Sequence, residues 1–301
     1  MDNLNNLKNS LESAQSLQKI VSTMKSISAV NIKKYEKVAI NLIKYKSNID
    51  LGLQAILKQY PHIINHIDYV ENNVEQDNLN KRDIVIIIGS NQGLCGRFND
   101  KVSEFYLENC INDNNKYIIT IGDRINMLIS AQKINIDKHF SIPNSTELIV
   151  NLVYDLSNII EQFLIAKNLR KVVVYFTSHN SHNNGNLIKK KILPLEKNYF
   201  EKLEKIKWPT NKIPYWRIKT KQIVSDLIQQ YIFTNIYFTI ANSMASEQKN
   251  RLITLQGAEE NIKDYITDTK LRYNQMRQNI ITAELIDVVS GARFLKRKNE
   301  E

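Results

Sequence analysis

The C-terminal part of the chain has a helical spacing of apolar residues with almost no interruption. Between Tyr215 and Phe294 there are two glycines and no proline. An alternating spacing of four and three residues links positions Leu227, Tyr231, Thr234, Phe238, Ala241, Ala245, Gln248, Leu252, Leu255, Glu259, Ile262, Ile266, Thr269 and Tyr273. This spacing is typical of the seam of a left-handed coiled coil. We therefore predict one helix of about 80 residues, which would be about 120 Å long.

The N-terminal part has the same character, because residues 3–60 contain one glycine and no proline. Its apolar stripe consists of Leu4, Leu7, Leu11, Ala14, Leu17, Val21 and Met24. Each helix can bury its stripe against the other helix. We predict that the terminal helices form an antiparallel coiled coil, a shaft, because the chain must return.

The middle of the chain alternates β-branched runs with helical patterns. Residues 83–88, 117–121 and 171–177 are the apolar runs, and helical patterns cover residues 99–110 and 145–166. Short apolar runs between helices indicate parallel strands buried on both faces. The predicted fold is therefore α/β, with a central Rossmann-like domain and a long helical coiled coil. The predicted boundaries are 1–60 for the N-terminal coiled-coil helix, 61–82 for a linker, 83–204 for the α/β domain, 205–214 for a connector and 215–301 for the C-terminal coiled-coil helix.

Composition narrows the class of protein. Only 8 glycines and 5 prolines occur in 301 residues, which excludes turn-rich and low-complexity architectures. The longest apolar runs fall far short of the roughly 18 residues that cross a bilayer, so we expect no membrane span. Cys95 and Cys110 are too few for a disulfide framework or a cysteine zinc site, which favours a reducing compartment. We also expect no targeting segment.

The charge of +10 indicates an acidic partner, which could be nucleic acid, anionic lipid or a protein surface. Five lysines lie on the first predicted helix, opposed locally only by Glu36: Lys33, Lys34, Lys37, Lys44 and Lys46. Nucleic-acid binding would favour a recognisable binding module, and none is evident in the sequence. An acidic protein partner is the better functional interpretation, and a solvated basic face remains the alternative.

A glycine-containing stretch from Gly89 to Gly96 follows a predicted strand and precedes a predicted helix. Its spacing fits neither the dinucleotide nor the mononucleotide phosphate-binding motif. We interpret Gly89, Gly93, Cys95 and Gly96 as parts of a tight structural turn. A nucleotide-binding α/β enzyme with a coiled-coil appendage remains the alternative, as does a nucleophilic Cys95, although no matched base is evident.

Histidines offer little support for a metal site. His62 and His66 are four residues apart beside Pro61, and His179 and His182 lie in a polar stretch. Neither pair has a marked carboxylate partner, so we expect surface histidines. The sequence predicts no catalytic set, no cofactor and no metal.

Several ordered strings then point to a family. They are SMASE at 243–247, Arg251, YNQMRQ at 273–278, ITAEL at 281–285 and Gly291-Ala292, preceded by QKI at 18–20, Met24, Ser28-Ala29, SNQGLCGRFN at 90–99 and ILP at 192–194. Across essentially its whole length, the chain resembles the gamma subunit of F-type ATP synthases.

The resemblance implies a non-catalytic rotor that couples proton flow to ATP synthesis or hydrolysis. It implies one copy per complex, with alpha and beta subunits, an epsilon or delta-equivalent subunit and a membrane c-ring as partners. The expected location is peripheral, on the cytoplasmic face of a bacterial inner membrane or on the mitochondrial matrix face. The residues that the resemblance assigns to coupling or to the rotor interface are Met24, Lys33, Lys34, Arg251, Gln278, Thr282 and Glu284. We expect Arg251 and Glu284 to project from the shaft.

Three residues at two places depart from the family pattern. Asn31 stands where the family usually has a lysine, so Lys33 or Lys34 is expected to replace its contact with the catalytic ring. Asn91-Gln92 replaces the usual Asp-Arg or Asp-Lys before the GLCG string. The regulatory cysteine insertion of the plastid form is absent from the sequence, so we expect no disulfide control.

Overall fold

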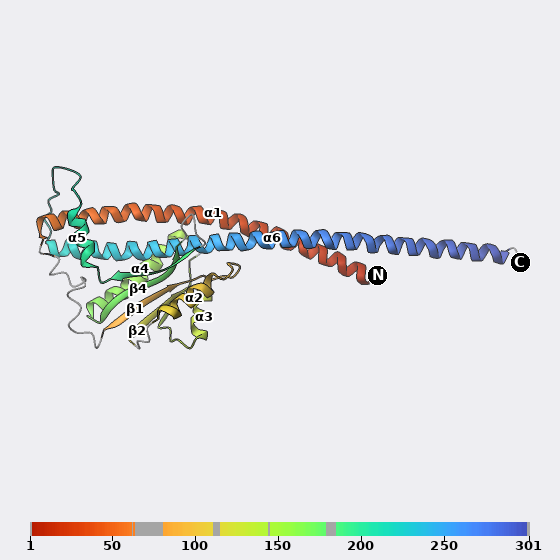
Figure 1. Ribbon diagram of the computed structural model, residues 1–301, viewed down its shortest axis with the longest axis horizontal. Helices are drawn as coiled ribbons and strands as arrows, with labels where there is room; N and C mark the ends of the chain where they lie inside the picture. Colours follow the sequence, from red (N-terminus) through yellow and green to blue (C-terminus); the bar gives the residue numbers. More distant parts are fainter. Residues whose placement is uncertain are drawn as a thin grey trace. The chain divides into compact units, whose positions relative to one another are not determined.

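The computed structural model describes residues 2–61, 63, 81–110, 115–143, 145–178 and 185–299. The chain forms two compact units: unit 1 consists of Met1–Ser28 and Leu252–Glu301, and unit 2 consists of Ala29–Arg251. Two long helices contribute to both units, α1 at Asp2–Gln59 and α6 at Thr220–Asn299. Figure 1 shows both helices. The predicted pair of long terminal helices is therefore confirmed.

In unit 1, α1 and α6 pack in opposite directions, and an ion pair joins Lys25 to Glu259. The stripe on α1 follows a strict alternation of three and four residues, so Gln18 is half-buried whereas Leu17 is 53% exposed. The prediction of Leu17 as a seam residue is thus wrong. The interval from Ala14 to the next seam position must be four residues for the stripe to keep facing the partner helix.

In unit 2, the same two helices again run antiparallel. Lys249 Nζ lies 2.6 Å from Glu36 Oε1, and Tyr45 Oη donates to Gln230 Oε1 at 3.1 Å. As the residue numbers increase along α1, the numbers of their partners on α6 decrease, as expected for antiparallel helices. None of the predicted seam positions on α6 is exposed. The heptad pattern therefore identified the correct face of this helix.

A five-stranded mixed sheet forms the centre of unit 2, with strand order β3-β2-β1-β4-β5. Its strands are β1 at Arg82–Ile88, β2 at Lys116–Ile121, β3 at Lys138–Phe140, β4 at Leu169–Ser178 and β5 at Asn186–Leu193. β1 pairs in parallel with β2 and β4, as predicted, and β2 pairs in parallel with β3. β5 is antiparallel to β4. The sequence pattern did not predict β3 or β5.

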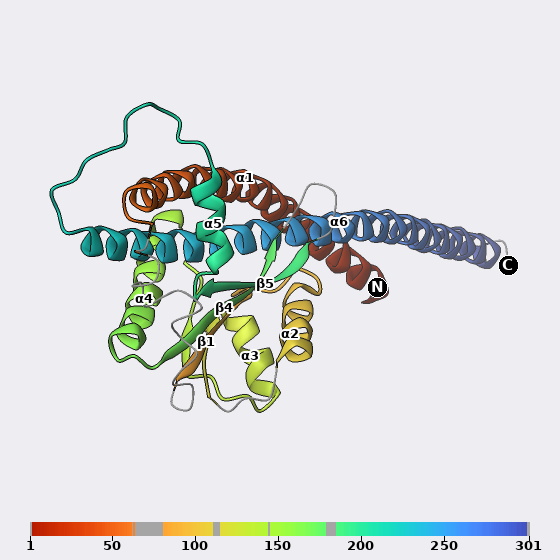
Figure 2. The same ribbon diagram turned by 60° about the vertical axis from the view of Figure 1, so that its left-hand side comes forward.

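Alternate residues of β1 enter two different cores. Ile84, Ile86 and Ile88 belong to the core formed with α4 at Thr146–Ile165 and with α1 and α6. Val85 and Ile87 belong to the core formed with α2 at Phe98–Asn109 and α3 at Asp123–Ala131. Figure 2 shows α2 and α3 on one side of the sheet. Helices on both faces explain the continuous apolar character of the central strands.

One helix of the described residues is long and apolar enough to cross a membrane by length and composition: the segment Glu147–Ile165 of α4, with a mean hydropathy of 1.4. Its inner side chains Ile149, Val153 and Leu156 are fully buried in the core of unit 2. The apolar character of α4 is therefore accounted for in part by packing on the sheet.

A short helix completes unit 2. α5, at Lys197–Lys205, buries Phe200 and Leu203. It precedes a segment without regular structure that leads to α6 at Thr220. Pro209 and Pro214 lie in this segment.

Candidate functional site

The turn that follows β1 has no room for a side chain at Gly89. A Cβ atom on Gly89 would lie 2.3 Å from Ile125 Cβ and 2.7 Å from Asn99 Oδ1. Farther along, Leu94 and Gly96 have φ angles of 61° and 59°, in the left-handed region that favours glycine. Close packing at Gly89 and backbone conformation at Gly96 therefore account for two of the predicted turn residues. Gly93 meets only Arg124 at ordinary contact distance.

Side-chain amides hold this turn in place. Ser90 N donates to Asn99 Oδ1 at 2.9 Å, and Asn99 Nδ2 donates to Ser90 Oγ at 2.8 Å. Asn91 Nδ2 donates to Ile142 O at 2.8 Å while its Oδ1 accepts from Ile142 N at 2.9 Å. Asn91, one of the departures from the family pattern, thus ties the turn to the segment after β3.

Arg251 of α6 reaches the same turn. The side chains of Arg251 and Glu247 are 8% and 6% exposed, and Nη2 of Arg251 lies 2.6 Å from Oε1 of Glu247. Nη2 also lies 3.4 Å from Gln92 O and 3.3 Å from Gly93 O. The expectation that Arg251 projects from the shaft is wrong, because the turn after β1 covers its guanidinium group.

Glu247 and Tyr35 belong to the buried cluster around Arg251 but were not predicted as site residues from the sequence. Tyr35 of α1 is 4% exposed, and Glu247 raises its pKa in addition to the larger effect of burial. Glu247 lies four residues before Arg251, a spacing that favours an ion pair on a helix. That spacing was the available signal for Glu247, whereas the position of Tyr35 depends on the tertiary fold.

The cluster provides an apolar environment for its ionisable groups. Burial raises the pKa of Glu247, and the neighbouring Arg251 only partly offsets this effect. Burial also raises the pKa of the Cys95 thiol, which is 2% exposed. A raised thiol pKa disfavours the thiolate that a nucleophile requires. Neither Cys95 nor Cys110 forms a disulfide bond in the described structure.

The other residues assigned to the rotor interface lie apart from this cluster. Lys33 and Lys34 are exposed on the part of α1 in unit 2, and Asn31 is half-buried. In unit 1, Met24 is half-buried while Gln278, Thr282 and Glu284 are exposed on α6. Glu284 therefore does project from its helix, as expected.

The end of α6 in unit 1 has a large exposed surface. Every residue from 281 to 292 is exposed, and this segment includes several large apolar side chains. Their exposed fractions are 61% for Leu285, 60% for Ile286, 69% for Val288 and 50% for Val289. Contiguous exposed apolar residues mark a surface that contacts another molecule.

No group of three or more histidine, cysteine, aspartate or glutamate residues that could hold a metal occurs within the described part of the chain. Residues His62, His66, His179 and His182 lie outside the described residues, as does most of the predicted 61–82 linker.

Comparisons with known proteins give matches over nearly the whole chain. A family model described as ATP synthase matches residues 3–295. The ATP synthase gamma chain of Rickettsia felis is 27% identical over 304 residues, covering 97% of this chain and 99% of the relative. The ATP synthase gamma chain of Campylobacter jejuni is 27% identical over 309 residues, covering 98% and 100%.

Solved structures share the fold. A chain from the OSCP/F1/c-ring structure of the Euglena gracilis mitochondrial ATP synthase aligns with a TM-score of 0.61 and 14% identity, covering 100% of this chain and 97% of its own. A chain from the central stalk and c-ring of the Tetrahymena thermophila enzyme aligns with a TM-score of 0.54 and 16% identity, covering 79% and 99%.

Proposed function

This chain belongs to the ATP synthase family, as the gamma subunit and central-stalk rotor of an F-type enzyme, and we propose that its rotation couples proton flow to ATP synthesis or hydrolysis on partner subunits. The observation that carries the proposal is the exposed surface of α6 from residue 281 to residue 292. Apolar side chains there have no cover among the described residues of unit 1. A rotor requires such a surface, because it must slide against several neighbours rather than lock onto one.

The composition of the helices supports a mechanical role. α6 has 80 residues and contains no proline, so nothing removes a backbone hydrogen bond along its length. In unit 1 the Lys25–Glu259 ion pair lies on the seam between the helices. In unit 2 the Glu36–Lys249 pair joins the same helices. These ion pairs join the two helices in both units, which supports a torque-bearing shaft.

We propose that Gln278, Thr282 and Glu284 contact the catalytic ring, and that Lys33 or Lys34 supplies the basic contact that Asn31 cannot make. All except the half-buried Asn31 are exposed, which leaves them available to a partner. Met24 is proposed to act through helix packing. Arg251 is proposed to act inside the chain, where it holds the turn after β1 against α6.

The proposed partners are the alpha and beta subunits, an epsilon or delta-equivalent subunit and the membrane c-ring, with one copy of this chain per complex. The Euglena neighbour comes from a structure that contains F1 and a c-ring, which supports this assignment. The gamma chains of Rickettsia and Campylobacter support a position on the cytoplasmic face of a bacterial inner membrane. The mitochondrial matrix face is the alternative.

We propose that this chain has no catalytic site or cofactor of its own. The turn from Gly89 to Gly96 would then be structural, and its side chains support this role. Ser90, Asn91 and Asn99 form hydrogen bonds within the chain, and the Cys95 thiol is buried. Titration of the isolated chain with ATP and ADP tests the point, and saturable micromolar binding would favour the rival assignment as a nucleotide-dependent enzyme.

Reconstitution tests the rotor assignment directly. Catalytic alpha and beta subunits are assembled on membranes that contain the c-ring, with and without this chain, and ATP-driven proton pumping is recorded together with ATP hydrolysis. We expect pumping only when the chain is present. A complex that pumps equally well without this chain would show that the rotor is another subunit.

Substitutions then test the proposed contact residues. The triple variant Gln278→Ala, Thr282→Ala, Glu284→Ala is expected to lower the ratio of protons pumped to ATP hydrolysed while the chain still assembles. Asp264→Ala is the matched control, because Asp264 is also exposed on α6 in unit 1. An equal effect of the control would remove the specific role of these three residues.

A further inference from the structure

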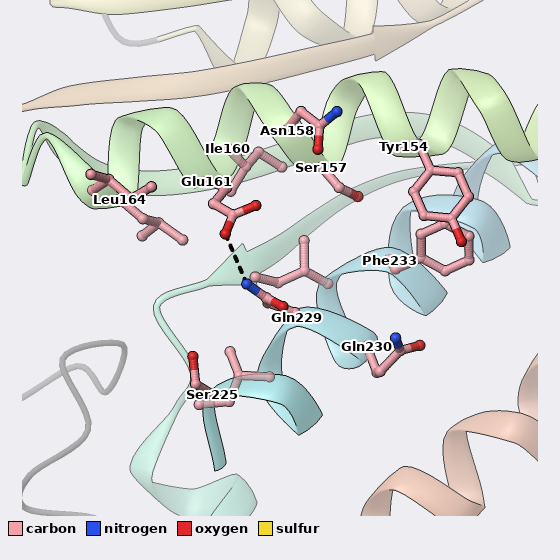
Figure 3. Close-up of a pocket in the computed structure, with 13 residues that line it drawn as sticks. Tyr154, Ser157, Asn158, Ile160, Glu161, Leu164, Ser225, Gln229, Gln230 and Phe233 are labelled. Atoms are coloured by element: carbon pink, nitrogen blue, oxygen red, sulfur yellow. Dashed lines mark hydrogen bonds between the residues drawn. The ribbon is translucent and has the colours of Figure 1, made fainter. Parts of the chain in front are cut away.

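A groove in unit 2 lies between α4 and the beginning of α6. It has a volume of about 340 Å³, within the size range of small-molecule sites. Figure 3 shows side chains of α4 along one side of the groove and side chains of α6 along the other. Neither the coupling residues nor the turn after β1 contributes to its lining.

Apolar and aromatic side chains make up about half of the residues that line the groove. The rings of Tyr154 and Phe233 lie together at one end, with centroids 5.0 Å apart. Ile160 and Leu164 of α4 and Ile228 of α6 also line the groove, together with polar residues of both helices. An aromatic pair beside aliphatic side chains provides a surface for a flat apolar group.

One charged residue, Glu161, lines the groove. Its Oε1 accepts a hydrogen bond from Gln229 Nε2 at 2.9 Å, drawn as a dashed line in Figure 3. No lysine, arginine or histidine among the described residues forms an ion pair with it. A carboxylate has about four acceptor sites on its two oxygens, so one donor leaves capacity for others.

A second polar atom lies on the same helix as this carboxylate. Ser157 Oγ is buried and has no hydrogen-bond partner within the described structure. Ser157 lies four residues before Glu161, so both project from the same face of α4. Figure 3 shows both side chains directed toward α6. A buried hydroxyl without a partner is costly, which favours a ligand that satisfies it.

We propose that this groove binds a small organic cation, namely a primary ammonium attached to an aromatic or aliphatic body. The ammonium donates to the Glu161 carboxylate and to Ser157 Oγ, and the body packs against Tyr154 and Phe233. A primary ammonium has three N–H donors, which matches two acceptors on one helix face. The site is independent of the rotor assignment, because it uses none of the residues proposed for coupling.

The charge of α4 favours a cation over other occupants. Residues 146–165 contain Glu147, Asp155 and Glu161 and no lysine or arginine, although the whole chain carries a charge of +10. An anionic ligand would face this carboxylate without a compensating cation in the lining. An anionic lipid surface would likewise be repelled by the acidic face of α4.

Calorimetric titration of the full chain with three probes tests the proposal. The probes are phenylbutylammonium, phenylbutanol and phenylbutyrate, which share one body and differ in the polar group. We expect phenylbutylammonium to bind about tenfold or more tightly than phenylbutanol, because a hydrogen bond to a charged group is stronger than one to a neutral group. Phenylbutyrate should bind most weakly. Equal binding of the alcohol overturns the proposal and leaves an apolar surface for a partner chain.

Three variants locate the site. Glu161→Gln should weaken phenylbutylammonium binding about tenfold, and Ser157→Ala about threefold. Asp155→Asn is the control, because Asp155 is exposed on the same helix but does not line the groove, and binding should change less than about twofold. Circular dichroism verifies that each variant is folded. Undiminished binding to Glu161→Gln, an equal loss in Asp155→Asn, or no binding of the ammonium at all overturns the proposal.

Discussion

The two units use the same helix in contrasting ways. In unit 2, apolar residues of α6 such as Ile236 and Ile240 are 1% and 0% exposed, because the sheet and α1 both cover this helix. In unit 1, Leu285 and Val288 of the same helix are 61% and 69% exposed. Unit 2 therefore holds its own core, whereas the end of α6 in unit 1 leaves its apolar residues exposed.

Ion pairs show the same contrast. Glu247 and Arg251 in unit 2 form a pair whose side chains are 6% and 8% exposed. Asp268 and Arg272 in unit 1 have the same four-residue spacing on the same helix, but their side chains are 57% and 69% exposed. Burial, rather than spacing, should decide what each pair contributes to stability.

Removal of one partner from each pair should produce the largest difference between the units. Arg251→Met leaves the Glu247 carboxylate buried without its cation and should cost about 3–5 kcal/mol in the free energy of unfolding. Arg272→Met should change it by less than about 0.5 kcal/mol. Urea denaturation of the full chain, followed by circular dichroism, measures both values.

A double variant separates the loss of the pair from the loss of packing. Glu247→Leu combined with Arg251→Met removes both buried charges and should recover most of the lost stability. If the double variant is as unstable as the single one, the hydrogen bonds from Arg251 to the turn matter more than the uncompensated carboxylate.

Matched leucine substitutions compare packing in the two units. Leu156 of α4 is fully buried in unit 2, so Leu156→Ala should cost about 2–5 kcal/mol through lost burial and a cavity. Leu285→Ala should cost less than about 0.5 kcal/mol in the isolated chain, because Leu285 is exposed. Denaturant unfolding again gives both values. A large loss in Leu285→Ala would show that residues of this chain cover the end of α6.

Alanine substitutions at two glycines should change the stability by smaller amounts and in opposite directions. In Gly89→Ala the new Cβ would lie 2.3 Å from Ile125 Cβ, which should cost about 1–3 kcal/mol as α3 and the turn move apart. Gly257 of α6 has nothing within 4 Å of an added Cβ, so Gly257→Ala should stabilise the helix by about 0.5–1 kcal/mol. Thermal unfolding of the two variants should shift in opposite directions. A destabilised Gly257→Ala would mean that flexibility in this helix is required for folding.

The sequence allowed prediction of elements whose pattern is long and uniform. The heptad spacing identified the buried face of α6, and β-branched runs identified β1, β2 and β4. β5 escaped prediction because Lys189, Lys190 and Lys191 interrupt its apolar pattern. The structure accommodates Lys190 by a 2.8 Å hydrogen bond to Asn235 Oδ1, although burial, the larger effect, and the nearby Lys46 together lower its pKa to about 8.

The candidate site was predictable only in part. The spacing of Gly89 and Gly96 between a strand and a helix indicated a tight turn. The burial of Arg251 could not be inferred, because an arginine on a helix is usually exposed and the turn that covers it is more than 150 residues away in the sequence. The contact of Asn91 with Ile142 likewise depends on the sheet that brings the two segments together.

The smallest expected effects concern the stability of the two units in acid. In unit 2, hydrogen bonds from Ser141 and His139 lower the pKa of Asp123, and in unit 1 the hydrogen bond from Lys25 lowers the pKa of Glu259. A lowered carboxyl pKa stabilises the fold above the unfolded value of about 4, and this contribution is lost as the pH falls through the folded value. Asp123→Asn should therefore be less stable than the parent chain at neutral pH, by less than about 1 kcal/mol because Asp123 is partly exposed, and the difference should shrink in acid. Urea unfolding across the acidic range, with Glu259→Gln as the counterpart in unit 1, measures this dependence. A difference that is constant or grows as the pH falls would mean that neither carboxylate stabilises its unit through its charge.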